Sequence, residues 1–255
     1  MEIDDPATGP SWELCCPVVA SPDGARLYAP VSSWPSWHGD TELDKERSRV
    51  AGTAWETLAF ISDDGGRSWP SYVTLFSGKL DGRIPCHDLV FWENKLISLS
   101  GNRMLNVAWT VEHATGKDLP VSFVMSRDGG RSWSDPRSTG LIGQTTTPLH
   151  LGDDRLLCVY RRKDKLGLWA VLAHIDETAG GAWVTDSQWP IWGTKTLGDE
   201  HTEQGFKPEG MGEVFKVLSF GLPTLVQLDA ATVLMAFWCE EEGITNIRTF
   251  KLHLE

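Results

Sequence analysis

The chain has 255 residues, of which 41% are apolar, so it can bury a sizeable core as one large all-β domain or as two small ones. A formal net charge of -12, with no window rich in Lys and Arg, argues against nucleic acid or an anionic membrane as a partner. No apolar run approaches the roughly 18 to 20 residues that span a bilayer, and the acidic N-terminus does not resemble a secretory signal. The chain as given is therefore expected to be soluble.

The cysteines indicate neither a disulfide framework nor a metal site. They are five in number, Cys15, Cys16, Cys86, Cys158 and Cys239, and they include no C-x-x-C pair of the kind that zinc sites and redox motifs use. We expect most of these thiols to be reduced and buried. No cofactor and no metal are predicted.

The first predicted unit, residues 13–80, consists of short β-rich runs separated by Gly, Asp and Asn turns. Strands are expected at 17–20, 26–31, 56–62 and 71–76. A long polar insertion at 35–53 separates the second strand from the third. Such runs are typical of an antiparallel meander, and no helical period competes with them.

The second predicted unit, residues 81–142, repeats this organisation with a different insertion. Its strands are expected at 88–92, 95–100 and 121–126. The stretch 102–120 is interpreted as a long insertion after the second strand. This unit would therefore have its longest connection at the same point as the first unit.

Two further units complete the chain. In the third unit, residues 143–195, strands are expected at 148–151, 155–160, 168–174 and 183–189; in the fourth, residues 218–255, they are expected at 224–228, 233–238 and 246–252. The last unit thus ends after three strands. Residues 1–16 are a candidate strand to complete this last unit, which would remove an open sheet edge. The alternative is that the four units belong to a longer repeat fold, a β-propeller, whose earlier blades are missing.

An eight-residue pattern, Ser-x-Asp-x-Gly-x-Ser-Trp, occurs at residues 62–69 and again at 126–133. Asp and Ser side chains bond nearby backbone, Gly takes positive φ, and Trp anchors the turn, as a tight hairpin requires. With weaker copies that end at Trp12 and Trp183, the tryptophans are spaced by 57, 64 and 50 residues. This period predicts a single all-β propeller domain over 1–255 with about four blades visible, an incomplete six-bladed ring being one alternative.

The two ends of such a blade have different expected roles. Turns after the first and third strands lie at the same end of a blade, and the repeated pattern follows the third strand. We therefore place the repeated pattern at that end and assign it to structure and not to catalysis. The opposite end collects the insertions at 35–53, 102–120 and 193–220. Long loops that converge around a central axis are typical of a binding site, and we predict the site there.

Arginines at that end are the predicted substrate-binding residues, since a guanidinium binds a planar carboxylate through two hydrogen bonds. They are Arg83, Arg103, Arg161 and Arg162. The alternative for each of them is a solvated surface position or an ion pair with the acidic residues 240–242.

Three residues are candidates for catalysis at the same end. His87 and Asp88 begin an inner strand, where an imidazole beside a carboxylate could exchange protons, and Tyr160 is the only tyrosine predicted there. The alternative for His87 and Asp88 is hydrogen bonding at the strand entry. A cluster in the last connection, His201, Glu203, Glu209 and Glu213, fits no metal motif and favours a solvated acidic loop.

The repeated pattern, its spacing and two local motifs resemble the sialidase (neuraminidase) superfamily, whose β-propellers carry Asp-box (BNR) repeats. Arg83-Ile84-Pro85 resembles the motif with one arginine of that family's carboxylate-binding triad, and residues 155–161 resemble the strand with a second, here Arg161. The resemblance covers most of the chain. It implies a sialidase-like β-propeller that acts on an acidic, sialic-acid-like sugar.

The chain departs from the family at the catalytic positions. Sialidases use a Tyr nucleophile activated by a Glu, with an Asp as acid and base. The Glu is expected near Gln144 or Thr145, the Tyr within 219–222, and the Asp in the loop after Arg103, where Asp118 is the only candidate. Three hypotheses follow: a glycan-binding propeller that is a glycoside hydrolase, a non-catalytic propeller that recognises a carbohydrate or a protein, and a truncated sialidase. Oligomeric state and compartment stay open.

Overall fold

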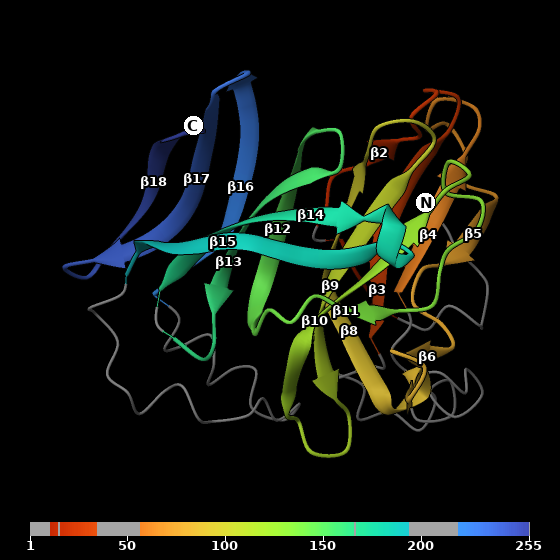
Figure 1. Cartoon of the computed structure of the whole chain (residues 1–255), viewed down its shortest axis with the longest axis horizontal. Coiled ribbons are helices and arrows are strands. Elements are labelled where there is room, and N and C mark those ends of the chain that lie inside the picture. The colour runs from red at the N-terminus through yellow and green to blue at the C-terminus, as the bar shows by residue number, and fades with distance from the viewer. Residues whose placement is uncertain (1–10, 15, 35–56, 166, 194–218, 255) are drawn as a thin grey trace. The chain divides into compact units, whose positions relative to one another are not determined.

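The computed structural model describes residues 11–14, 16–34, 57–165, 167–193 and 219–254 (Figure 1). The predicted all-β fold is confirmed, since the described chain is built from antiparallel sheets. Contacts divide it into two compact units, Met1–Ala114 with Ser122–Ser138, and Thr115–Val121 with Thr139–Glu255. Within the described residues, no helix is long and apolar enough to cross a membrane.

The first sheet of the first unit contains the strands that the sequence predicts for residues 17–76, together with a strand at residues 11–13. They are β1 (Ser11–Glu13), β2 (Val19–Ala20), β3 (Leu27–Trp34), β4 (Thr57–Ser62) and β5 (Ser71–Thr74), in the order β1-β3-β4-β5 with β2 also on β3. β4 pairs with one edge of β3. β1 and β2 both pair with the other edge, β2 near the beginning of β3 and β1 near its end. The expectation that the N-terminal strand completes the last blade is therefore wrong for the described residues, because Trp12 stands opposite Ser33.

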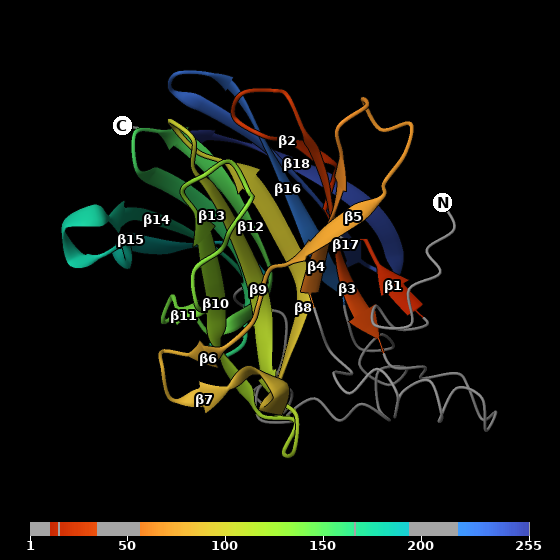
Figure 2. The ribbon, with the colours of Figure 1, turned by 90° about the vertical axis from the view of Figure 1, so that its right-hand side faces the viewer.

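The second sheet has the order β11-β10-β9-β8, and a two-stranded hairpin precedes it. The hairpin is β6 (Lys79–Leu80) and β7 (Ile84–Pro85); the sheet is β8 (Leu89–Ser98), β9 (Met104–Glu112), β10 (Asp118–Ser126) and β11 (Arg137–Ser138). The boundary between the two units crosses β10 after Val121. β8 lies beside β3 of the first sheet (Figure 2), and Asn94 Nδ2 donates to Ser32 Oγ across them at 3.1 Å.

Two sequence interpretations of this sheet are wrong. The turn expected between 92 and 95 is a β-bulge inside the continuous strand β8, where Glu93 has a φ of 50°. The insertion expected at 102–120 contains β9, which is buried on both faces and so lacks the alternation that marks a half-exposed strand. Arg103 therefore follows the first strand of the blade, not the second. It lies at the end of the repeated turn, because Gly129 N donates to the neighbouring Asn102 O at 2.8 Å.

The two repeated turns, residues 62–69 and 126–133, have the same hydrogen bonds. Asp64 Oδ1 accepts from the backbone nitrogens of Arg67 and Ser68, both at 2.9 Å, and Ser68 Oγ donates to Asp64 Oδ2 at 2.6 Å. Asp128 repeats these contacts in the second turn at 3.0, 2.9 and 2.6 Å. The glycines have positive φ, so the turn chemistry predicted from the sequence is present in both copies.

The first repeated turn should make stability depend on pH. Hydrogen bonding from Ser68 lowers the pKa of Asp64 to about 2. Because the folded-state pKa lies below that of the unfolded chain, about 3.9, the stabilisation is complete above about pH 4 and is lost as the pH falls through about 2. We expect Asp64→Asn to be less stable than the wild type at pH 7 and equal to it near pH 2, in urea melts at each pH. Parallel pH profiles for the two proteins would contradict this role.

The second unit contains one four-stranded and one three-stranded sheet in its described part. They are β12 (Gly143–Gly152), β13 (Arg155–Arg162), β14 (Leu168–Asp176) and β15 (Ala182–Trp192), followed by β16 (Phe220–Asp229), β17 (Thr232–Glu241) and β18 (Ile244–His253). The strands predicted for these units are confirmed. Their sequences alternate or are continuously apolar over short runs, which is the clearest strand signal.

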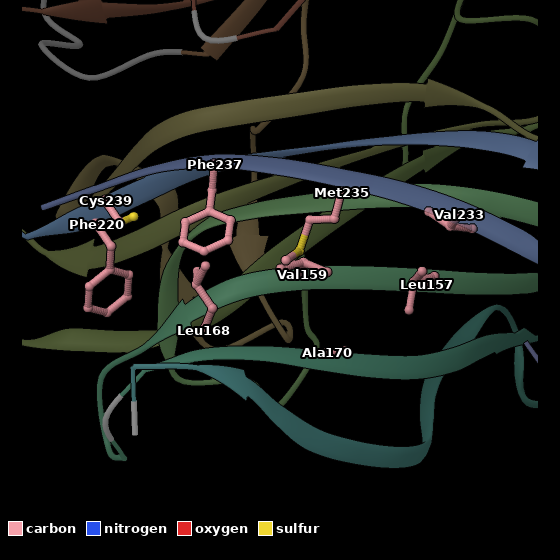
Figure 3. Packing of buried hydrophobic residues seen from close by; sticks show 9 residues of the cluster. All are labelled: Leu157, Val159, Leu168, Ala170, Phe220, Val233, Met235, Phe237 and Cys239. Atoms are coloured by element: carbon pink, nitrogen blue, oxygen red, sulfur yellow. The ribbon is translucent and has the colours of Figure 1, made fainter. Parts of the chain in front are cut away.

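The core of the second unit lies between its two sheets. Figure 3 shows Phe237 and Met235 of β17 directed toward Val159 and Leu168 of the other sheet. Phe237 is 2% exposed and packs edge-on against Trp192 with a centroid distance of 5.4 Å. Odd-numbered residues of β17 therefore face this core, and even-numbered ones face away from it.

Candidate functional site

Arg161 is the predicted site residue that lies close to several other polar groups of the second unit. It stands on β13, opposite Gln144 of β12. Its Nη2 donates to Gln144 Oε1, and its Nη1 donates to the backbone oxygen of Phe220 at 3.0 Å. Phe220 begins β16, so the guanidinium joins the beginnings of two strands that belong to different sheets. These two contacts orient the guanidinium at this strand end.

Two glycines allow this close approach. A Cβ atom on Gly143 would collide with the ring of Tyr160 and would lie 2.6 Å from the backbone oxygen of Arg161. A Cβ atom on Gly221 would lie 3.2 Å from Arg161 Nη1 and 3.3 Å from Trp238 Nε1. The guanidinium and the indole nitrogen thus approach the same point of β16, and both nitrogens carry donor hydrogens. Arg161, Gln144, Gly221 and Trp238 are called the Arg161 cluster below.

Tyr160 is packed beneath this cluster and is not presented to solvent. Its side chain is 1% exposed and lies against Gly143. Burial raises the pKa of Tyr160 to about 12, so the phenol stays neutral near pH 7. A nucleophile must be reachable and activated, which makes Tyr160 a poor fit for the catalytic role that the sequence suggests.

Arg162 is held by groups of its own sheet. Its Nε and Nη2 donate to the two carboxylate oxygens of Asp164 at 2.6 and 2.8 Å, and its Nη1 donates to Gln188 Oε1 at 2.9 Å. The guanidinium also lies 4.5 Å from the ring centre of Trp169. The paired charges lower the pKa of Asp164 and raise that of Arg162. This bidentate pair favours a structural role over sugar binding for Arg162.

Asp118, the acid and base candidate by resemblance, begins β10 within the second unit. Its Oδ2 lies 3.4 Å from Lys163 Nζ, and Lys163 N donates to Ile142 O at 3.0 Å. Lys163 directly follows the end of β13. Asp118 is therefore engaged in an ion pair with the residue that directly follows Arg162.

His87 and Asp88 lie in the first unit, on a short 3-10 turn (Cys86–Asp88) before β8. His87 Nε2 is 3.2 Å from Asp88 Oδ1, and the two side chains are 69% and 55% exposed. Asp88 O accepts from His113 N at 2.9 Å, so the pair lies at the end of the sheet opposite the repeated turns. Its exposure leaves the pair without the enclosure that general acid–base catalysis favours.

Arg83 is exposed in the turn between β6 and β7. Asp81 of the same turn bonds the outermost strand region of the second sheet: its N donates to Pro136 O at 3.0 Å and its Oδ1 accepts from Ser138 N at 3.1 Å. Arg83 therefore lies beside β11, at the edge of the sheet farthest from β8. Arg103, at the end of this sheet that carries the repeated turn, donates from Nε to Ser100 O at 3.1 Å.

The sequence does not mark every member of the Arg161 cluster as a site residue. Gln144 stands near the position where the resemblance expects a Glu, and Gly221 lies in the segment where it expects a Tyr. A bulge between Gln144 and Thr147 hides the register of Gln144 with β13, and a bulge between Gly221 and Thr224 hides that of Gly221 with β17. The sequence contains one weak signal for the cluster: Gln144, Gly221 and Arg161 all lie near the ends of predicted strands or units.

Other predicted features lie outside the described residues. They are the insertion at 35–53, most of 193–220, and the acidic cluster His201, Glu203, Glu209 and Glu213. Within the part of the chain that is described, no group of three or more His, Cys, Asp and Glu side chains is arranged to hold a metal ion.

Comparison with solved structures identifies the fold. The Hadza microbial sialidase Hz136 matches 95% of this chain with a TM-score of 0.57 at 11% identity, and a Dyadobacter fermentans protein of unknown function matches 93% with a TM-score of 0.61 at 17% identity. A Bacteroides ovatus protein described as Xyloglucan PUL GH43B matches 97% with a TM-score of 0.50 at 10% identity. No family model and no curated protein matches the sequence.

These similarities show an all-β, sialidase-like propeller fold, in agreement with the fold class predicted from the repeats. The match covers 52% of the Dyadobacter protein, 45% of the sialidase and 40% of the Bacteroides protein. The chain thus spans about half the length of the solved structures that it resembles.

Proposed function

We propose that this chain is a sialidase-like glycan-binding propeller that recognises the carboxylate of an acidic sugar through Arg161. The observation that carries the proposal is the guanidinium held between Gln144 Oε1 and Phe220 O, where two strands of different sheets begin. A carboxylate gains short, charge-assisted hydrogen bonds from a guanidinium that is already oriented. Trp238, beside it, supplies an indole donor and an aromatic surface suited to the apolar face of a sugar.

Binding without hydrolysis is the activity that this cluster supports best. Gln144 stands where the sialidase resemblance expects a carboxylate, and an amide cannot accept a proton near pH 7. Tyr160 is buried and keeps its proton. The cluster can orient and bind an anion, but it holds no activated nucleophile.

The same proposal includes the finer family assignment. The hydrogen bonds shared by residues 62–69 and 126–133 support their identity as Asp boxes of the BNR type. In this interpretation the boxes stabilise the blades and take no part in sugar binding.

Arg161→Ala is the direct test. We expect the dissociation constant for N-acetylneuraminic acid to rise roughly 30-fold in calorimetric titrations, since charge-assisted hydrogen bonds contribute about 2 kcal/mol. Arg155→Ala is the matched control, because Arg155 is exposed at the far end of the same strand. Equal binding by the wild type and Arg161→Ala, across acidic and neutral sugars, would show that Arg161 is not the binding residue.

A second candidate function, glycoside hydrolysis, rests on the His87–Asp88 pair. If it holds, the wild type should cleave a member of a fluorogenic glycoside panel, and Asp88→Asn should lower kcat at least 100-fold while Arg155→Ala retains it. If the wild type cleaves no member of the panel, hydrolysis is excluded and glycan binding is the function that remains.

A further inference from the structure

The side-chain amide of Gln144 has a fixed orientation. A guanidinium carries donors only, so the Gln144 atom that faces Arg161 Nη2 is the oxygen Oε1. The nitrogen Nε2, with its two donor hydrogens, therefore points away from the guanidinium. Gln144 is 2% exposed, and its Nε2 has no acceptor in the part of the chain that the structure describes. A buried donor of this kind is unfavourable until an acceptor is supplied.

Two β-bulges meet at this site. β12 has a bulge between Gln144 and Thr147, and β16 has one between Gly221 and Thr224. Thr147 Oγ1 donates to Pro223 O at 2.7 Å, so the two bulges are bonded to each other. Bulges are over-represented next to active sites, where they redirect a side chain. The end of β12 that carries Gln144 is thus held against the end of β16 that carries Gly221.

The side chains of the Arg161 cluster present donors to a ligand. Arg161 Nη1 and Trp238 Nε1 lie 3.2 and 3.3 Å from the position of a Cβ atom on Gly221, so both approach the same side of β16. Neither a guanidinium nor an indole nitrogen can accept a hydrogen bond, and Gln144 Oε1 already accepts from Arg161. Such a set of donors favours a group that only accepts, and an ionised carboxylate is a group of this kind.

A carboxylate has two oxygens, and the second one needs a donor other than Arg162. Arg162 is bound to both carboxylate oxygens of Asp164 and to Gln188 Oε1. Gln144 stands directly opposite Arg161 in the register of β12 and β13. Its Nε2 is therefore the donor that is fixed to the same guanidinium and still has hydrogens to give.

We propose that Gln144 is a ligand-binding residue that determines specificity: Oε1 holds the guanidinium of Arg161, and Nε2 donates to the second oxygen of the carboxylate that Arg161 binds. The site then selects an ionised carboxylate over its ester, because the ester has no charge and its alkyl group would face a donor. This inference rests on the proposed binding through Arg161. It extends that proposal to the residue that stands near the position where the family resemblance expects a Glu.

Gln144→Glu isolates the donor. The variant keeps an oxygen for Arg161 Nη2, but it replaces Nε2 by a carboxylate oxygen that repels an anion. We expect the dissociation constant for N-acetylneuraminic acid at pH 7 to rise at least about 30-fold, and that for its methyl ester to change less than about 3-fold. Gln188→Glu is the matched control, because Gln188 Oε1 also accepts from an arginine, Arg162 Nη1, at 2.9 Å, but lies outside the cluster. It should bind both compounds like the wild type.

The pH dependence separates a ligand contact from a structural role. Near pH 4 the carboxyl group introduced by Gln144→Glu is partly protonated, since an ordinary Glu has a pKa of about 4.3, and its O–H is again a donor. Binding of N-acetylneuraminic acid by this variant should strengthen at least about 3-fold between pH 7 and pH 4, while the wild type and Gln188→Glu change less than about 2-fold. Weak binding that does not recover at pH 4 would assign Gln144 a structural role and overturn the proposal.

Calorimetric titrations that include Arg161→Ala separate this inference from the proposal on which it rests. If Arg161→Ala weakens binding and Gln144→Glu binds the acid like the wild type, the role of Gln144 is overturned and binding through Arg161 stands. If Gln144→Glu does not fold, Gln144→Met has a similar size and no donor, and it should bind about 10-fold more weakly. Wild-type affinity in Gln144→Met would likewise overturn the role. If the wild type does not bind N-acetylneuraminic acid, both proposals fail.

Discussion

Phe237→Ala is expected to lower the free energy of unfolding of the second unit by about 4 kcal/mol, the usual cost of truncating a buried phenylalanine. Phe237 is 2% exposed and contacts rings on two sides: Trp192 at 5.4 Å and Phe250 at 5.9 Å. The contact with Trp192 attaches the β16-β17-β18 sheet to β15, and Phe237 helps to fill the core shown in Figure 3. The loss should lower Tm by about 10 °C.

Urea unfolding followed by tryptophan fluorescence measures this effect. Val226→Ala is the control, because Val226 lies on the other face of the same sheet and is 51% exposed, so its truncation should change stability by less than about 0.5 kcal/mol. Equal stability of Phe237→Ala and Val226→Ala would mean that the two sheets do not pack as described. A single cooperative transition in the wild type would in addition argue against the hypothesis of a truncated sialidase.

Gly143→Ala is the second change with a large expected effect. The added Cβ would collide with the Tyr160 ring and lie 2.6 Å from Arg161 O, and a backbone oxygen inside a sheet cannot easily move away. We expect a loss of about 3 kcal/mol, the upper range for overpacking a close contact. Because Gly143 precedes Gln144, the strand end that orients Arg161 should move as well, and sugar binding should weaken together with stability.

Gly221→Ala provides the contrast that separates packing from binding. Its Cβ would meet Arg161 Nη1 at 3.2 Å and Trp238 Nε1 at 3.3 Å, both at the far ends of long side chains that can shift. Stability should therefore fall by less than about 1 kcal/mol, while the affinity for an acidic sugar falls because both donors are displaced. Differential scanning calorimetry and titration of the same preparations measure the two effects. If Gly143→Ala melts like the wild type, the close contact between β12 and β13 is not as described.

Local patterns were sufficient for much of the fold. The repeated turns form as predicted because their hydrogen bonds join residues at most four positions apart, such as Ser68 Oγ to Asp64 Oδ2. The strands of the second unit were recognisable because their apolar residues either alternate or run continuously. The same reasoning misses β9, because Asn106 and Thr110 are fully buried and bond to other side chains inside the protein, so that the strand lacks the alternation that marks a half-exposed strand.

Neighbouring residues are sufficient to predict that the chain is an all-β repeat protein and that Arg161 lies near the end of a strand. The contacts of Arg161 follow from the tertiary structure, because its partners Gln144 and Phe220 lie 17 and 59 positions away, and Gln144 stands next to a bulge that shifts the strand register. The tertiary structure likewise encloses Tyr160 and joins Arg162 to Gln188, 26 positions away. Burial and contacts of this kind arise when distant strands pack, and they separate residues that look equivalent along the chain.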